Sequence, residues 1–197
     1  SGALTSLTSL TLLRLDGNGL DLPTPNELTN SANLHTLSLT NNHISTMPNL
    51  APHTQLQTLH LGGNRIADLG PDPFAHMPAL TSLRVDANRL SDVPADLFAS
   101  NPALQSLNMS DNFIGLLKAG TFNNNPNLTF LGMVLNVGTR INSHVFPTTA
   151  RAAAALSTDG WTEYNGKWGN YWTAPGHGIS YSFNWARPGY TGPKVAF

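Results

Sequence analysis

The chain has 197 residues, of which 40% are hydrophobic and 11% are charged, and its formal net charge is −1. This balance describes one body with a sizeable core, and it argues against a protein that binds nucleic acid or an anionic membrane through a basic stripe. The chain contains no cysteine, which excludes structural disulfides and thiol catalysis, and no apolar run is long enough to predict insertion into a membrane.

One pattern of apolar positions and an asparagine recurs along most of the chain. Its clearest copy runs from Leu80 to Leu90 and reads LTSLRVDANRL, or L-x-x-L-x-V-x-x-N-x-L. Equivalent copies begin at Leu10, Leu34, Leu56, Leu104 and Leu128. The interval between copies is 24 residues, except for one interval of 22. Such self-similarity at a fixed period indicates a repeat protein.

Each copy contains the alternation of a short strand. Leu83 and Val85 are two residues apart and point to one side, whereas Ser82, Arg84 and Asp86 point to the other. A lone strand cannot bury its apolar side or pair its backbone, so consecutive copies must stack as a parallel sheet. Strands are predicted near residues 12–15, 36–39, 58–61, 82–85, 106–109 and 130–133.

An asparagine occupies the same place in all six copies. The column consists of Asn18, Asn42, Asn64, Asn88, Asn112 and Asn136. An amide carries both a donor and an acceptor, so it can satisfy backbone groups that point inward where each strand turns away. We therefore expect this column to be buried.

These motifs resemble those of the leucine-rich repeat family from about Leu4 to Phe146, in its extracellular type with repeats of 24 residues. The resemblance implies an α/β-type solenoid, a right-handed horseshoe arc of short parallel strands. Proline, glycine and asparagine in the outer halves of the repeats favour a convex side that is irregular or made of short helical turns. Two domains are expected, namely a solenoid over residues 1–150 and a C-terminal segment over residues 151–197.

The C-terminal segment has a different composition. All four tryptophans, all four tyrosines and two of the eight phenylalanines lie in the last 37 residues. The stretch ISYSFNW alternates as a half-buried strand does, and WTEYNGKWGNYW predicts a hairpin with Asn-Gly in its middle. This segment either covers the open end of its own solenoid, docks on another molecule, or stacks its tryptophan and tyrosine rings on sugars.

The sixth repeat favours a cover, because its outward positions are apolar where earlier repeats are polar. The candidate cap or assembly contacts are Phe130, Val134 and Leu135 in the repeat, with Trp161, Trp168, Trp172, Tyr181, Phe183 and Trp185 in the tail.

The outward strand positions of the other repeats form the concave surface that the resemblance implies is used for binding. The candidate residues are Arg14, Asp16, Ser38, His60, Arg84 and Asp86. Two Arg-x-Asp pairs on this surface have the chemistry to hold a polar ligand. In most proteins such pairs neutralise each other on a solvated face and contribute about 0–1 kcal/mol, and we favour that interpretation here.

The sequence contains none of the catalytic motifs G-x-S-x-G, H-E-x-x-H or a phosphate-binding loop, so no enzyme activity, metal or cofactor is predicted. Two sequons place candidate N-glycans on Asn108 and Asn127. A glycan on Asn108 would obstruct the concave face.

The predicted function is that of a non-catalytic, extracellular or cell-surface module that binds a protein or glycan. The alternative is a structural protomer of a cell wall, surface layer or filament, which self-associates through its solenoid ends and aromatic tail.

Overall fold

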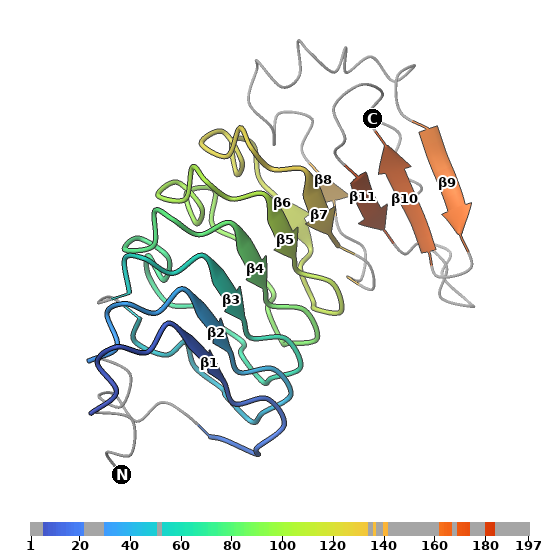
Figure 1. Ribbon diagram of the computed structural model, residues 1–197. Coiled ribbons are helices and arrows are strands. Elements are labelled where there is room, and N and C mark those ends of the chain that lie inside the picture. Colours follow the sequence, from blue (N-terminus) through green and yellow to red (C-terminus); the bar gives the residue numbers. More distant parts are fainter. Residues whose placement is uncertain are drawn as a thin grey trace.

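The computed structural model describes residues 6–21, 30–50, 53–133, 136, 140–141, 162–166, 169–173 and 180–183. Among them is one three-residue strand for each of the six repeats, and these strands stack along the molecule (Figure 1). They are β1 (Leu12–Arg14), β2 (Thr36–Ser38), β3 (Thr58–His60), β4 (Ser82–Arg84), β5 (Ser106–Asn108) and β7 (Phe130–Gly132). The six predicted strands are thus confirmed.

These six strands pair in parallel, with every pair in the same register. Leu13, Leu37 and Leu59 are paired across β1 to β3, and Leu83, Leu107 and Leu131 continue the row. Because each strand offers its neighbour the same residue of the repeat, like side chains stack on like side chains. The 22-residue interval between the second and third copies leaves this register unchanged, so its shorter segment is absorbed outside the strands.

The core is the inward side of this stack. The central strand leucines are buried, as are the apolar residues two positions later from the second repeat onward. Phe74, Phe98 and Phe122 form the opposite side of the core, with ring centroids 5.9 and 5.8 Å apart and nearly parallel planes. Each repeat therefore buries one strand side chain against the outer half of its own coil and of its neighbours.

The asparagine column forms the predicted ladder from the second repeat onward. Asn88 is 7% exposed, and its Nδ2 donates to the carbonyl oxygens of Leu61 and Val85, at 3.0 and 3.1 Å. Its Oδ1 accepts the N–H of Ile66 at 2.9 Å. The amide thus ties its own coil to the preceding one. Asn42, Asn64, Asn112 and Asn136 make the same kinds of bonds.

The burial prediction is wrong for the first member, Asn18, which is exposed. Among the described residues its Nδ2 reaches only the carbonyl oxygen of Asp16 in its own coil. The described residues place no preceding coil beside Asn18 whose carbonyls it could satisfy, and the backbone N–H of Asn18 is instead capped by the Oδ1 of Asn42 in the next coil.

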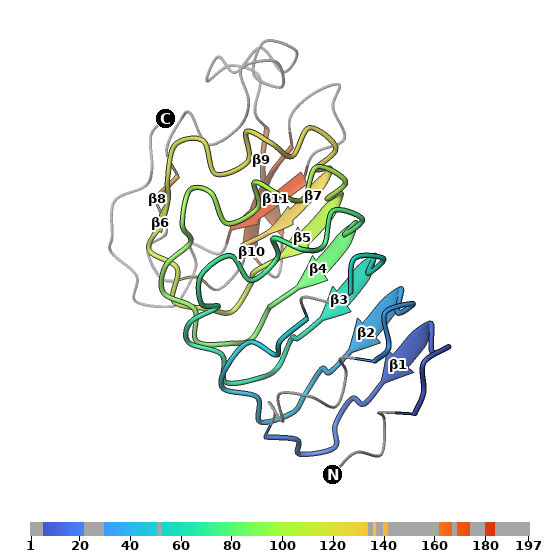
Figure 2. The ribbon, with the colours of Figure 1, turned by 90° about the vertical axis from the view of Figure 1, so that its left-hand side faces the viewer.

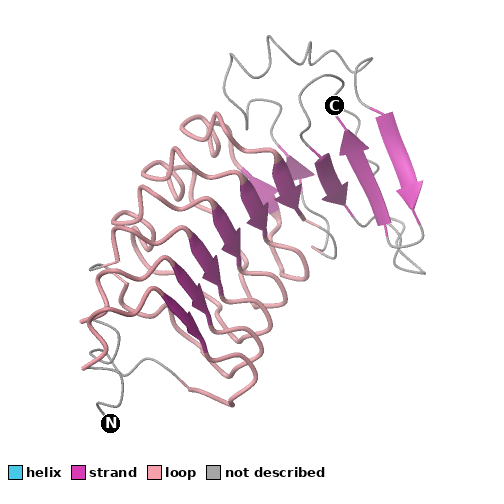
Figure 3. Cartoon of the chain, in the orientation of Figure 1, coloured by secondary structure: helices cyan, strands magenta, loops and turns pink. Residues whose placement is uncertain are grey.

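The convex side consists of turns, and no helix lies among the described residues (Figure 3). The irregular form of the predicted convex side is therefore the one observed. One short parallel pair occurs there, between β6 (Leu116–Leu117) and β8 (Arg140–Ile141). In the part of the chain that the structure describes, no helix has the length and apolarity needed to cross a bilayer.

A second polar column on the convex side was not predicted. Asn101 is buried, and its Nδ2 donates to the carbonyl oxygens of Phe74 and Met77 in the preceding coil. Asn125 repeats this arrangement on Phe98 and Asn101. Both asparagines lie three residues before the first leucine of a repeat. The Asn-Pro-x-Leu motif that they share was the sequence feature from which this column could have been predicted.

Three further strands extend the sheet beyond the sixth repeat. They are β9 (Thr162–Gly166), β10 (Gly169–Thr173) and β11 (Ser180–Phe183), and the sheet order is β1-β2-β3-β4-β5-β7-β11-β10-β9. Figure 2 shows β11 beside β7 at the end of the stack, and the two pair in parallel, with Tyr181 opposite Leu131. The edge of β7 is therefore paired within the same chain.

The predicted strand and hairpin are both present in this segment. β9 and β10 are antiparallel, with Gly166 opposite Gly169, but Asn165 and Gly166 lie inside β9, so the Asn-Gly dipeptide is not at the centre of the hairpin as expected. The proposed end of the solenoid near residue 150 falls outside the described residues.

Candidate functional site

The outward side of β1–β5, which we call the strand face, carries the candidate binding residues. Because all the strands share one register, Arg14, Ser38, His60, Arg84 and Asn108 form one row across the sheet. A second row lies two residues further along each strand and includes Asp16, Thr40, Gly62, Asp86 and Ser110. The structure thus brings the six predicted residues onto one surface.

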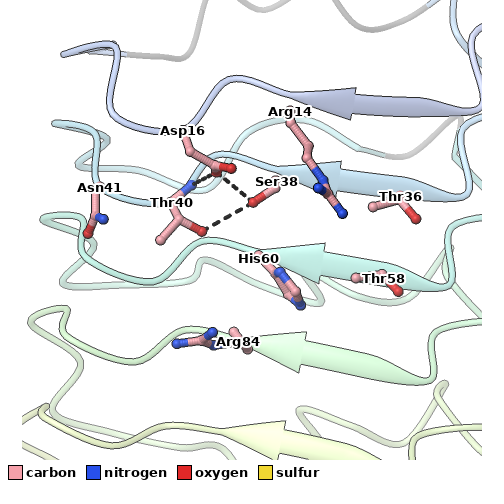
Figure 4. A pocket seen from close by; sticks show the side chains of 9 residues that line it. All are labelled: Arg14, Asp16, Thr36, Ser38, Thr40, Asn41, Thr58, His60 and Arg84. Atoms are coloured by element: carbon pink, nitrogen blue, oxygen red, sulfur yellow. Dashed lines mark hydrogen bonds between the residues drawn. The ribbon is translucent and has the colours of Figure 1, made fainter.

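A cavity of about 460 Å³ lies on this face (Figure 4). Five of the six predicted residues line it, namely Arg14, Asp16, Ser38, His60 and Arg84. Thr36, Thr40, Asn41 and Thr58 complete the lining. None of these four is among the six candidate residues predicted from the sequence. Thr36 and Thr58 occupy the first outward position of their strands, so the alternation that predicted Arg14 and Ser38 was sufficient to find them.

Asp16 is bound by the neighbouring coil. Its Oδ1 accepts a hydrogen bond from Ser38 Oγ and another from the Thr40 N–H, the latter at 2.8 Å. Ser38 Oγ also lies 3.2 Å from Thr40 Oγ1. These bonds favour the charged carboxylate, and the hydrogen bond from Ser38 is the main reason why the pKa of Asp16 lies below its ordinary value. Asp16 is thus held by hydroxyl and backbone donors.

Arg84 and Asp86 form a forked ion pair on a single strand. Arg84 Nε lies 3.0 Å from Asp86 Oδ1, and one terminal guanidinium nitrogen lies 2.9 Å from Oδ2. These hydrogen bonds raise the pKa of Arg84. Gly62 lies beside the pair, where an added Cβ would come within 2.9 Å of Asp86 Oδ1, so the absence of a side chain at Gly62 leaves room for the carboxylate.

Arg14 differs from Arg84, because the described residues offer it no hydrogen bond or ion pair. Its side chain extends over β2, between Ser38 and Thr36 (Figure 4). His60 lies across the cavity on β3 and is partly buried. Burial, followed by the positive charge of Arg84, lowers the pKa of His60. The cavity therefore presents one unpaired cation and one imidazole that is held towards its neutral form.

The two sequons lie in different surroundings. Asn108 is half-buried, and its Oδ1 accepts the Ser110 N–H at 3.1 Å. The same oxygen would clash with a Cβ on Gly132, so the Asn108 side chain lies over β7. Asn127 is exposed, and its Nδ2 donates to the carbonyl oxygen of Pro102.

The predicted cap contacts are only partly within the described residues. Phe130 in β7 is 39% exposed, which agrees with an outward apolar position. Trp172 lies in β10, and Tyr181 and Phe183 lie in β11. Val134, Leu135, Trp161, Trp168 and Trp185 lie outside the described residues. The contacts of the tail side chains therefore stay a prediction.

No group of three or more histidine, aspartate or glutamate side chains that could hold a metal ion occurs among the described residues. The chemistry of the strand face is that of hydrogen bonding and charge pairing. Its donors are a guanidinium, two threonine hydroxyls and an imidazole, and its carboxylates already have donors of their own.

Solved structures with the same fold include several leucine-rich repeat domains. The leucine-rich repeat domain of APL1B aligns with a TM-score of 0.61 at 22% identity, over 69% of this chain and 40% of that one. A chain of the LRIM1/APL1C complex aligns at 0.64 and 21%, over 71% of this chain and 26% of that one. The internalin InlF of Listeria monocytogenes aligns at 0.55 and 25%, over 72% and 39%. The chain thus spans less than half the length of these solved chains.

No curated protein sequence matches the chain. The model of the leucine rich repeat family matches residues 32–90 and 78–137, which together cover more than half of the sequence. These two matches contain the repeats that begin at Leu34, Leu56, Leu80, Leu104 and Leu128. The periodicity, the single register of the strands and the amide ladder agree with that match, and the chain belongs to the leucine-rich repeat family.

Proposed function

We propose that this chain is a non-catalytic interaction module that binds a protein through its strand face, at the cell surface or outside the cell. The observation that carries the proposal is the cavity over β1–β4, where Arg14 and the hydroxyls of Thr36 and Thr58 have no hydrogen-bond partners among the described residues. Polar groups of this kind, fixed on a rigid sheet, are available to a ligand without first breaking bonds within the protein.

Two further observations support a protein ligand. The ladder asparagines and the strand pairing fix the backbone below the face, so little conformational entropy is lost when a partner binds. The LRIM1/APL1C structure contains a leucine-rich repeat chain in a complex with another protein. A glycan ligand has less support, since the described strand face of β1–β5 contains no aromatic side chain on which a sugar ring could stack.

A protein outside the cell or at its surface can be N-glycosylated at its sequons, which are at Asn108 and Asn127 here. Asn127 is the better acceptor, because its side chain is exposed, whereas Asn108 lies against Gly132 on the strand face. Expression in a eukaryotic secretory pathway, followed by intact-mass measurement before and after glycosidase treatment, tests both sites. We expect a glycan on Asn127, and two bare sites would contradict this part of the proposal.

Assembly into a wall or filament has less support than partner binding. β11 pairs with β7 in the same chain, so the last repeat does not offer its own strand edge to an end-to-end neighbour. Sedimentation velocity over a hundredfold range of protein concentration tests this, and we expect one species throughout.

The binding proposal is tested with two variants that remove the same residue types from different surfaces. Arg14→Ala/Arg84→Ala alters the strand face, whereas Arg65→Ala/Arg89→Ala removes two exposed arginines from the turns after the ladder asparagines. The wild type is first screened against an array of purified extracellular proteins, and each hit is measured with both variants by surface plasmon resonance. We expect at least a tenfold loss of affinity for the strand-face variant alone. Equal affinities, or a loss confined to Arg65→Ala/Arg89→Ala, would overturn the proposal.

A further inference from the structure

Two arginines of the same Arg-x-Asp pattern line the cavity on the strand face. The guanidinium of Arg84 is bound in the forked pair with Asp86. Arg14 has no such pair, since Asp16 is held by Ser38 and Thr40 in the next coil. One cation at the rim of the cavity is therefore charged, oriented over β2 and available (Figure 4).

Two uncharged hydrogen-bond donors, the hydroxyls of Thr36 and Thr58, line the same cavity as Arg14. Thr36 and Thr58 are directly paired on β2 and β3, and both line the cavity. In the described residues neither hydroxyl has a hydrogen-bond partner, whereas the Ser38 hydroxyl is taken by Asp16. Two hydroxyls next to a guanidinium are suited to the two oxygens of a planar oxyanion.

His60 adds a group that responds to the charge of a ligand. The charged groups around it are Arg14 and Asp16 from the first coil, and Arg84 and Asp86 from the fourth. Burial, followed by the charge of Arg84 and more weakly that of Arg14, lowers the pKa of His60, while the two carboxylates raise it. An anion placed between Arg14 and His60 would raise the pKa of His60 further, because it stabilises the imidazolium.

The charge of the cavity favours a monoanion. Its two arginines and the carboxylates of Asp16 and Asp86 cancel, so the imidazole decides the net charge. With the imidazole protonated the net charge of the cavity is positive by one unit, which a monoanion neutralises and a dianion such as phosphate exceeds. A carboxylate carries one charge and offers two acceptor oxygens to the fork of Arg14.

We infer that the cavity between β1 and β3 binds the carboxylate of a glutamate or aspartate side chain on a protein partner, with Arg14 as its ion-pair partner and His60 as the opposite wall. The inference rests on the proposed function, and it adds the chemical class of the group that the strand face recognises. Because the carboxylate binds the protonated imidazole better, binding takes up a proton and strengthens as the pH falls through the titration of His60.

The experiment measures carboxylate binding at the cavity and does not require the partner to be known. The intact chain, labelled with 13C at its histidine rings, is titrated with N-acetylglutamate amide, which presents one side-chain carboxylate, and with N-acetylglutamine amide as the uncharged control. Chemical shifts give the pKa of His60, and the His60→Gln variant assigns its resonance. We expect the glutamate probe alone to raise the pKa of His60, and to bind about tenfold more tightly at pH 5.5 than at pH 8.

Variants locate the effect. Arg14→Gln should weaken binding of the glutamate probe about tenfold or more, since it removes the free guanidinium, whereas Arg65→Gln should leave binding unchanged. An unshifted His60, an equal response to the glutamine probe, or full binding by Arg14→Gln would overturn the inference. A response to inorganic phosphate or sulfate that exceeds the response to the glutamate probe would also overturn it. The proposed function would survive these outcomes if partner binding still required the strand face.

Discussion

The first and fourth coils carry the same outward pattern, Arg-x-Asp, and the structure gives the two pairs different partners. In the fourth coil Arg84 and Asp86 bind each other through two hydrogen bonds. In the first coil Asp16 is bound by Ser38 and Thr40, so Arg14 is left without a partner among the described residues. The neighbouring coil, rather than the local sequence, therefore decides whether an arginine on this face is free.

The difference has a simple steric and chemical cause. Asp16 has the donors Ser38 and Thr40 beside it in the second coil, at a distance that a carboxylate can bridge. The equivalent neighbours of Asp86 in the fifth coil are Asn108 and Ser110, but the Ser110 N–H donates to Asn108 Oδ1. The Asp86 carboxylate instead lies over Gly62 and binds Arg84 on its own strand. The residues at these two positions of the following coil therefore separate a free arginine from a paired one.

The largest expected contrast between these coils concerns the asparagine ladder beneath them. Asn88→Ala should lower the free energy of unfolding by about 2–3 kcal/mol, because it leaves buried carbonyls and the N–H of Ile66 unpaired. Asn18→Ala should cost less than about 0.5 kcal/mol, since Asn18 is exposed. Urea unfolding of both variants measures the contrast, and equal losses would refute our account of the column.

A second contrast concerns the residue that follows each Asp of the two pairs. Gly17 and Ala87 both have positive φ, of 67° and 50°, and only glycine adopts this conformation without strain. Ala87→Gly should stabilise the protein by about 0.5–1 kcal/mol, and Gly17→Ala should destabilise it by about 1 kcal/mol. A Cβ on Gly17 would meet nothing within 4 Å, so the loss would be purely conformational. Thermal unfolding of the two variants should therefore move in opposite directions.

A third contrast is the pH dependence that Asp16 adds to stability. Its pKa in the folded protein is lowered from the ordinary value of 3.8, mainly by the hydrogen bond from Ser38. Its contribution is therefore complete above the unfolded pKa and is lost as the pH falls below about 3.8 through the folded pKa. Because Asp16 is largely exposed, we expect at most about 1 kcal/mol.

Unfolding of the wild type and of Asp16→Asn between pH 2 and pH 6 measures this contribution. The two should differ at pH 6 and converge at the acid end. A difference that persists at pH 2 would mean that the Asp16 carboxylate acts by some means other than its charge.

The smallest contrast is the coupling within each pair. A double-mutant cycle on Arg84 and Asp86, with substitutions to Gln and Asn, should give about 0.5 kcal/mol, as is usual for a partly exposed forked pair. The same cycle on Arg14 and Asp16 should give a smaller value, because the charge of Arg14 is the weakest of the causes that lower the pKa of Asp16. A coupling of equal size in the first coil would show that Arg14 is paired in solution, and it would remove the basis of the proposed carboxylate site.

Most of the fold was predictable because it repeats. The strand positions, the inward leucines and the burial of five of the six ladder asparagines follow from residues that recur at the same place in each copy. Asn18 was mispredicted because burial of a ladder residue requires a coil on each side, and the described residues place none before the first. The convex column of Asn101 and Asn125 was missed because the second and third coils have His53 and Met77 in the same place.

The repeats in the sequence were enough to specify the solenoid, its register and the residues of its outward rows, because a stacked repeat places equivalent residues side by side whatever they are. Which of those residues bind one another depends on how the coils pack in space. Asp16 and Ser38 are 22 positions apart in the chain, and their hydrogen bond depends on side-chain reach and direction across the strands. Arg14 is available for the same reason, since its freedom is set by the partners that Asp16 finds in the next coil.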